Sequence, residues 1–286
     1  KKGQTIDNYQ FKPNEINSLA KSIDYSTSDI VDKAVESIKE VYLEYLNDDT
    51  CSTKIYAIMQ KLTDIDPGFT YNIAFDNNNI ATGIVWMTST MRSNLHKFGS
   101  FLCLDALKRT TNVFEWPYIG PTVVNDLNKI TVVCEAFCVS ERKHAYTFVL
   151  KSMLQMAPTF DPNMIKVVYS DEFLTNSILE DAGLSHTRLI YDHYHLHLNF
   201  HKSIGPLYNV KYREFFTSLL NASCEFEFYL LLSEARKEFK DNSNALKEIN
   251  YIKSNKDQCV AYVIDSIEGS CSKRGSTHAE QNHSSI

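Results

Sequence analysis

Two aspartates in this sequence stand next to short apolar runs, in positions from which a carboxylate can hold a metal ion. Asp105 directly follows residues 101–104, and Asp171 stands at the carboxyl end of the run 165–169. In open α/β sheets, ligands bind at the carboxyl ends of the strands. Carboxylates gathered there can share a pair of divalent ions, which activate a water or a 3′-hydroxyl and stabilise the leaving oxygen of a phosphodiester. Hard oxygen ligands favour Mg²⁺ or Mn²⁺. The alternative for each position is an aspartate that only closes a turn after a strand.

A histidine-rich segment at residues 192–201 is the second candidate for chemistry, because it contains four of the nine histidines. As a strand, it would place His193, His195 and His197 on one face, which is a plausible zinc constellation. As a helix, it would instead align His193, His197 and His201 along one stripe. Periodicity does not choose between the two structures, and a hydrogen-bonded histidine without a ligand is a further alternative.

The elements that must position these residues follow from the hydrophobic pattern. Residues 1–65 have helical spacing, and Pro67 begins a turn before two apolar runs that flank Asp76 and three asparagines, which predicts a β-hairpin. Further helices are predicted after Ser140, which we expect to be an N-cap, at 174–182, and from 208 to 267. The predicted strands are residues 69–75, 80–87, 101–104, 113–124, 130–139, 165–169 and 188–191. From residue 98 on, the order β-β-β-α-β-α-β-α predicts an α/β fold with a mixed sheet flanked by helices.

Composition limits the class of protein. The chain has 286 residues, a net charge of −6, 43% hydrophobic and 22% charged residues, which is ordinary for a globular protein. No apolar run approaches the ~18 residues of a membrane span, so no membrane partner is expected. The acidic balance argues against a generic DNA-binding module, but not against an enzyme that gathers carboxylates around metal ions. Seven scattered cysteines without a Cys-x-x-Cys pair indicate reduced thiols in the cytosol or nucleus.

Three segments resemble, in order, the catalytic motifs of Mutator-like element (MULE) transposases. Residues 101–112 are similar to the first-aspartate strand, with Asp105 followed by a stretch rich in Lys, Thr and Asn. Residues 167–171 resemble the second-aspartate strand. Residues 277–286 resemble the third motif, in which the glutamate, here Glu280, is followed by an Asn-His pair, here Asn282 and His283. The resemblance covers about residues 80–286.

The resemblance implies an RNase H-like fold in which Asp105, Asp171 and Glu280 are catalytic and hold two Mg²⁺ (or Mn²⁺) ions. It also implies two regions: a helical N-terminal region ending in the hairpin at 1–97, and a catalytic core at 98–286. An all-helical insertion, about 203–272, precedes the helix that carries the last catalytic residue.

A histidine motif adds a fourth point of resemblance and also one departure from the family's pattern. The family has Cys-x-x-His where this chain has Asp192 and His195, so the histidine matches and the cysteine is replaced, which puts any thiolate-dependent role in doubt. We expect Asp192 and His195 to support the active site or lie close to DNA, together with Asn282 and His283. Lys108 and Arg109 are candidates for phosphate contacts, with a solvated loop as the alternative.

The sequence therefore predicts the catalytic core of a DDE-type DNA transposase, a polynucleotidyl transferase that cleaves transposon DNA and transfers its strands. Its partners would be the transposon ends and target DNA, in the nucleus, as a homo-oligomer. The alternative is a domesticated, transposase-derived transcriptional regulator that binds DNA without catalysis, which the substitution at Asp192 and the acidic charge favour. Because the family's zinc-binding DNA-recognition domain and SWIM-type finger have no counterpart in the sequence, we expect weak, salt-sensitive DNA affinity and weak activity from this chain alone.

Overall fold

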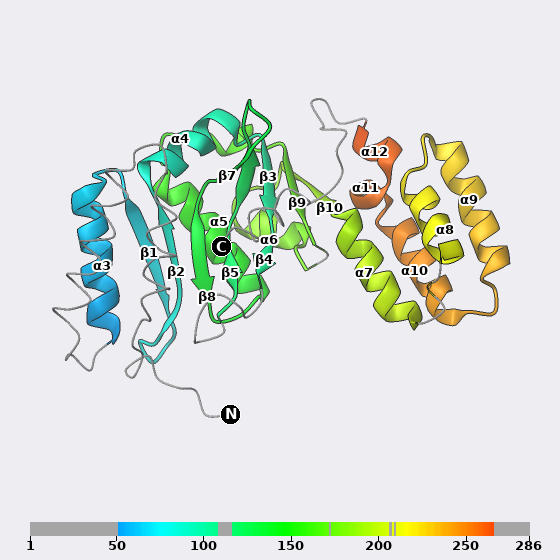
Figure 1. Ribbon diagram of the computed structural model, residues 1–286, viewed down its shortest axis with the longest axis horizontal. Coiled ribbons are helices and arrows are strands. Elements are labelled where there is room, and N and C mark those ends of the chain that lie inside the picture. Colours follow the sequence, from blue (N-terminus) through cyan, green and yellow to red (C-terminus); the bar gives the residue numbers. More distant parts are fainter. Residues whose placement is uncertain (1–50, 108–115, 172, 206–207, 209, 266–286) are drawn as a thin grey trace.

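The computed structural model of the chain describes residues 51–107, 116–171, 173–205, 208 and 210–265. Two mixed or antiparallel β-sheets with flanking helices form one part of the molecule, and a group of helices lies beyond the last strand (Figure 1). The predicted α/β class is confirmed. The helices predicted within residues 1–50 lie outside the described residues, and no described helix is long and apolar enough to cross a membrane.

The predicted hairpin is present and follows helix α3 (Cys51–Ile65). Strands β1 (Thr70–Phe75) and β2 (Ala81–Met87) pair antiparallel, and the carboxylate of Asp76 accepts hydrogen bonds from the backbone N–H groups of Asn78 and Ile80 in the turn. Helix α4 (Ser89–Phe98) comes next and was not predicted. Its N-cap is Thr88, whose hydroxyl accepts the Met91 N–H at 3.1 Å, so a capping threonine begins a helix that only a few apolar residues support.

Three antiparallel segments build the centre, and each passes from one sheet to the other. Strand β3 (Phe101–Leu104) continues as β4 (Ala106–Leu107), β5 (Tyr118–Ile119) as β6 (Thr122–Val124), and β7 (Ile130–Val132) as β8 (Glu135–Cys138). One sheet has the order β1-β2-β8-β5-β4 and the other the order β10-β9-β3-β6-β7. Asp105 is therefore the residue at which the chain leaves the second sheet. Strand β2 lies before residue 97, where the sequence predicted a boundary between two regions, and β8 lies after it, so the β2–β8 pairing joins the two regions in one sheet.

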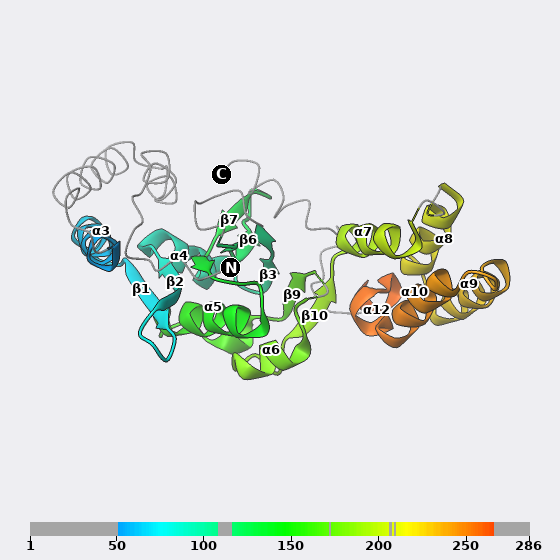
Figure 2. The same ribbon diagram turned by 90° about the horizontal axis from the view of Figure 1, so that it is seen from below.

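Two parallel strands complete the second sheet. Strand β9 (Val167–Ser170) follows helix α5 (Lys143–Met156) and the short 3₁₀-helix η2 (Pro162–Met164), and β10 (Arg188–Tyr191) follows helix α6 (Asn176–Asp181). Helices α5 and α6 cover the same side of the sheets (Figure 2). The expected N-cap at Ser140 is wrong. The chain bends at residues 139, 141 and 142, and the helix begins only after Arg142, which is the N-cap but makes no side-chain capping bond. The Ser140 hydroxyl instead lies 3.3 Å from His144 Nε2.

A buried carboxylate links three strands of the first sheet. Glu135 on β8 is 6% exposed and accepts hydrogen bonds from Trp86 Nε1 of β2 at 3.0 Å and from the Tyr118 hydroxyl of β5 at 2.9 Å. Burial and, secondarily, the charge of Glu135 raise the pKa of Tyr118 well above its usual value. The phenol therefore keeps its proton and acts as the donor, which leaves the buried charge hydrogen-bonded on both oxygens.

The predicted insertion is helical across its described part. Helix α7 (His193–Ile204) leads away from β10, followed by α8 (Val210–Leu220), α9 (Glu225–Glu238), α10 (Ser243–Ser254), α11 (Lys256–Cys259) and α12 (Ala261–Asp265) (Figure 1). Buried rings join these helices, among them Phe200 and Phe216 with ring centroids 4.6 Å apart. Helix α11 packs against β10, so the helical group is attached to the second sheet at two places, through α7 and through α11.

Candidate active site

Three aspartates stand at the same level of the second sheet. The parallel register pairs Leu104 with Ser170 and Ser170 with Tyr191, and the next residue in each strand is an aspartate: Asp105 after β3, Asp171 after β9 and Asp192 after β10. Because β9 lies between β3 and β10, its carboxylate has one aspartate on either side. The expectation that Asp105 and Asp171 lie at neighbouring strand ends agrees with this geometry.

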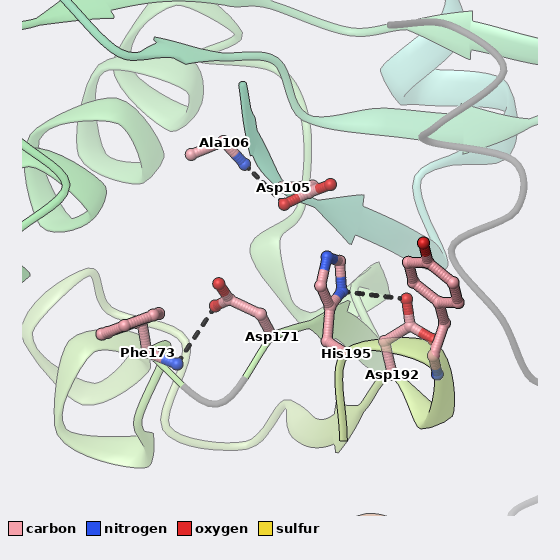
Figure 3. Close-up of polar contacts among 7 residues, drawn as sticks. Asp105, Ala106, Asp171, Phe173, Asp192 and His195 are labelled. Atoms are coloured by element: carbon pink, nitrogen blue, oxygen red, sulfur yellow. Dashed lines mark hydrogen bonds and ion pairs between the residues drawn. The ribbon is translucent and has the colours of Figure 1, made fainter. Parts of the chain in front are cut away.

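Local backbone bonds orient the first two carboxylates. Asp105 is buried, and its Oδ1 accepts the N–H of Ala106 at 2.8 Å, whereas the half-buried Asp171 accepts the N–H of Phe173 at 3.1 Å. Figure 3 shows these two carboxylates and the imidazole of His195 arranged around a common space. Two carboxylates from adjacent strands supply the hard oxygen ligands that Mg²⁺ and Mn²⁺ prefer, so the residues present fit a divalent ion.

The third aspartate holds a histidine beside the other two. Asp192 is 2% exposed and caps α7, with one carboxylate oxygen accepting the Tyr194 N–H at 2.9 Å and the other lying 3.1 Å from His195 Nδ1. The hydrogen bond to Asp192 raises the pKa of His195; burial opposes it, and the negative charges of Asp105, Asp192 and Asp171 reinforce it. His195 is thus favoured as an imidazolium, with its second ring nitrogen on the side of Asp105 (Figure 3).

The histidine run is a helix, which decides between the two predicted structures. His193 and His197 face the helical group: His193 Nε2 lies 2.7 Å from the Cys259 carbonyl, and His197 contacts the hydroxyls of Tyr208 and, at 3.3 Å, Thr217. Burial, followed by the positive charges of His193 and Arg213, lowers the pKa of His197 to about 4. In the part of the chain that the structure describes, no three His, Cys, Asp or Glu side chains are grouped to hold a metal ion, so the run supports no zinc site there.

Several predicted site residues lie outside the described residues. These are the third catalytic candidate and four supporting residues: Glu280, Lys108, Arg109, Asn282 and His283. Conversely, the sequence did not predict Tyr146 as a residue that senses the charges of the site. It is 1% exposed on α5, and burial followed by the charges of Asp171, Glu141 and Asp105 raises its pKa. A tyrosine within an apolar helical stripe gives no sequence signal that distinguishes it from ordinary core.

The site combines two carboxylates able to bind divalent cations with an imidazole next to them whose pKa is raised by the hydrogen bond to Asp192. Such a set can bind a metal and an anionic oxygen of a substrate at the same edge of a sheet. No family model matches the chain, and no curated protein matches its sequence.

Proposed function

We propose that this chain is the catalytic core of a DDE-type DNA transposase of the Mutator-like kind, which cleaves phosphodiester bonds and transfers DNA strands. The observation that carries the proposal is the shared level of Asp105 and Asp171 on adjacent parallel strands, with His195 of α7 beside them (Figure 3). The succession of three antiparallel segments, a helix, a parallel strand, a helix and a second parallel strand supports an RNase H-like fold.

In this proposal, Asp105 and Asp171 hold two Mg²⁺ or Mn²⁺ ions together with Glu280, whose position is inferred from the third motif alone. When bound, the ions supply Lewis-acid activation of a water and then of a 3′-hydroxyl. The protein's own contribution is to hold the two aspartates rigidly, because each accepts a backbone N–H and follows a strand paired on both sides. Rigid ligands reduce the reorganisation needed when charge develops on the phosphate.

His195 is proposed to donate a hydrogen bond to a phosphate oxygen of the bound DNA. Its raised pKa favours the charged form, in which both ring nitrogens carry protons. Nδ1 is engaged by Asp192, so Nε2 is the donor directed toward substrate. Asp192 is a positioning residue, and a carboxylate suits this position because it caps α7 and binds the imidazole simultaneously. The departure from the family's cysteine is therefore compatible with an active site.

The partners follow from the chemistry. The substrates are transposon ends and target DNA, and strand transfer between two ends calls for at least two copies of the chain. The nucleus is the compartment in which a eukaryotic enzyme of this kind meets its substrate.

The proposal is tested by divalent-dependent nicking of supercoiled plasmid DNA by the full chain, with Mg²⁺ or Mn²⁺ and an EDTA control. Asp171→Asn keeps the shape of the side chain but removes its charge, so we expect nicking to fall by about 100-fold or more. Asp126→Asn is the matched control, because Asp126 is an exposed turn residue away from the strand ends, and it should nick like the wild type.

Nicking that is the same in Asp171→Asn and in the wild type would overturn the proposed site. DNA binding by the wild type without any divalent-dependent nicking would favour the second function, a transposase-derived regulator. Thermal unfolding of all three proteins checks that a loss of nicking reflects chemistry and not a loss of fold.

A further inference from the structure

A groove with a volume of about 480 Å³ lies on the helical group, between α9 and α10. Four basic residues line it: Arg236 and Lys237 on α9, Lys240 just after that helix, and Lys253 on α10. Tyr229, two turns before Arg236 on α9, also borders it and is 43% exposed. We call this feature the cationic groove. None of its lining residues belongs to the candidate active site.

The lining of the cationic groove is basic, although basic and acidic side chains are about equally numerous in this part of the chain. Residues 210–265 contain eight basic and nine acidic side chains, yet the lining of the groove includes no carboxylate. On α9, Tyr229 and Arg236 are seven residues apart and therefore share one stripe, and Lys240 lies two residues beyond the end of the helix. Glu238 is directed elsewhere, because it forms an ion pair with Lys211 of α8. Glu225, one turn before Tyr229, is paired in turn with Lys256, so these two carboxylates of α9 are engaged by lysines that do not line the groove.

The cations of the groove lie near one another, and no carboxylate in the lining neutralises them. Arg236 donates a hydrogen bond to Asn250 Oδ1 at 2.7 Å, which fixes the guanidinium between α9 and α10. Lys237, Lys240 and Lys253 are exposed, and within the described residues no carboxylate forms an ion pair with them. Like charges placed together raise the energy of the free protein and are stabilised by a bound anion. A polyanion with several regularly spaced charges satisfies four cations better than a single small anion.

We propose that the cationic groove binds the phosphodiester backbone of a nucleic acid. Cations along a groove are the usual basis for backbone contacts, and Lys256, whose Nζ lies 5.7 Å from the centroid of the Tyr229 ring, adds a further cation at the border of the groove. The inference deepens the proposed function and rests on it for one point, the identity of the nucleic acid as DNA. It adds that the helical group grips DNA at a surface separate from the strand ends where cleavage takes place. An acidic protein segment is the competing ligand.

The test measures binding of the full chain to a fluorescently labelled duplex by anisotropy, in EDTA, over a fourfold range of salt concentration. The variant is the triple substitution Lys237→Gln, Lys240→Gln and Lys253→Gln, which leaves the Arg236–Asn250 bond intact. Each phosphate contact contributes about 0.9 to the slope of log affinity against log salt, so loss of three lowers the slope by about 2.7. The fourfold rise in salt should then weaken the wild type about 40-fold more than the variant.

A control with the same loss of charge uses three exposed lysines outside the groove, Lys129→Gln, Lys151→Gln and Lys247→Gln. It should keep the wild-type slope. Equal slopes for the wild type and the groove variant would overturn the inference, as would an equal effect of the control. Competition by poly-glutamate at the same concentration as unlabelled duplex would also overturn it, because the groove would then prefer acidic protein. Since EDTA removes divalent ions, the outcome is independent of whether the chain cleaves DNA.

Discussion

Removal of the Tyr118 hydroxyl should destabilise the protein by about 1.5–3 kcal/mol, the usual contribution of a hydrogen bond to a charged group. Tyr118 is 2% exposed, and its hydroxyl lies 2.9 Å from a Glu135 carboxylate that is itself 6% exposed. In Tyr118→Phe, this oxygen of the buried Glu135 carboxylate loses the hydrogen bond from the phenol, and because the site is buried, no bulk water replaces that bond. For a loss of ~2 kcal/mol in a chain of this size, the melting temperature should fall by about 4–8 °C.

Thermal unfolding followed by circular dichroism, together with urea unfolding, measures this change. Tyr194→Phe is the matched control, because Tyr194 is 52% exposed, so stability should change by less than about 0.5 kcal/mol. In a Glu135→Gln background the bond is between neutral groups, and Tyr118→Phe should then cost only about 0.5–1.5 kcal/mol. An equal cost in both backgrounds would refute the idea that the charge of Glu135 is what the phenol stabilises.

Two predictions concern pH and the histidines of α7. Asp192→Asn should lower the pKa of His195, because the hydrogen bond to the Asp192 carboxylate is the largest influence that raises it. An NMR titration of the imidazole in the wild type and in the variant measures this change. An unchanged pKa would contradict the hydrogen bond between the two side chains. Since the folded pKa of His195 is raised, its protonation stabilises the fold below the ordinary value of ~6.5, and this contribution is lost as pH rises through the folded pKa. His197 has the opposite sign: with a folded pKa of about 4, it contributes stability above ~6.5 that is lost as pH falls toward 4. Urea unfolding between these limits should show a smaller loss for His197→Phe than for the wild type, and identical pH profiles would show that His197 is not a source of acid sensitivity.

The parts of the fold that local pattern determines were predictable from the sequence. The hairpin around Asp76 and the strands before Asp105 and Asp171 follow from short apolar runs that end at polar residues, and the structure has strands there. Helix α4 was missed because its sequence, Ser89–Phe98, is mostly polar and buries chiefly Met91 and Leu95, so hydrophobic spacing carries little information. The start of α5 was misplaced because Ser140 is a favourable cap by type, whereas bends at residues 141 and 142 delay the helix until Lys143.

The parts of the site that depend on tertiary contacts were not predictable. The histidine run fits both helical and strand periods, and what distinguishes them is the packing of His193 and His197 against distant residues, including the Cys259 carbonyl. That Asp192 stands level with Asp171 depends on the register between β9 and β10, which hydrophobic pattern alone does not determine. The cationic groove likewise gathers residues from two helices, and Lys253 joins the α9 cations only because α10 packs beside that helix.

The position of β9 between β3 and β10 has a consequence for how the protein folds. Asp105 and Asp171 are separated by 66 residues in sequence, and their carboxylates become neighbours only when β9 pairs with β3. Pairings over such sequence distances pay a large loop-closure entropy and form slowly compared with helices. The helical group is dominated by contacts between successive helices and so has lower contact order than the sheet. We therefore expect the full-length chain, when it refolds from denaturant, to acquire the structure of the helical group first and the paired carboxylates late, so that the proposed cation binding at the strand ends would report completed folding.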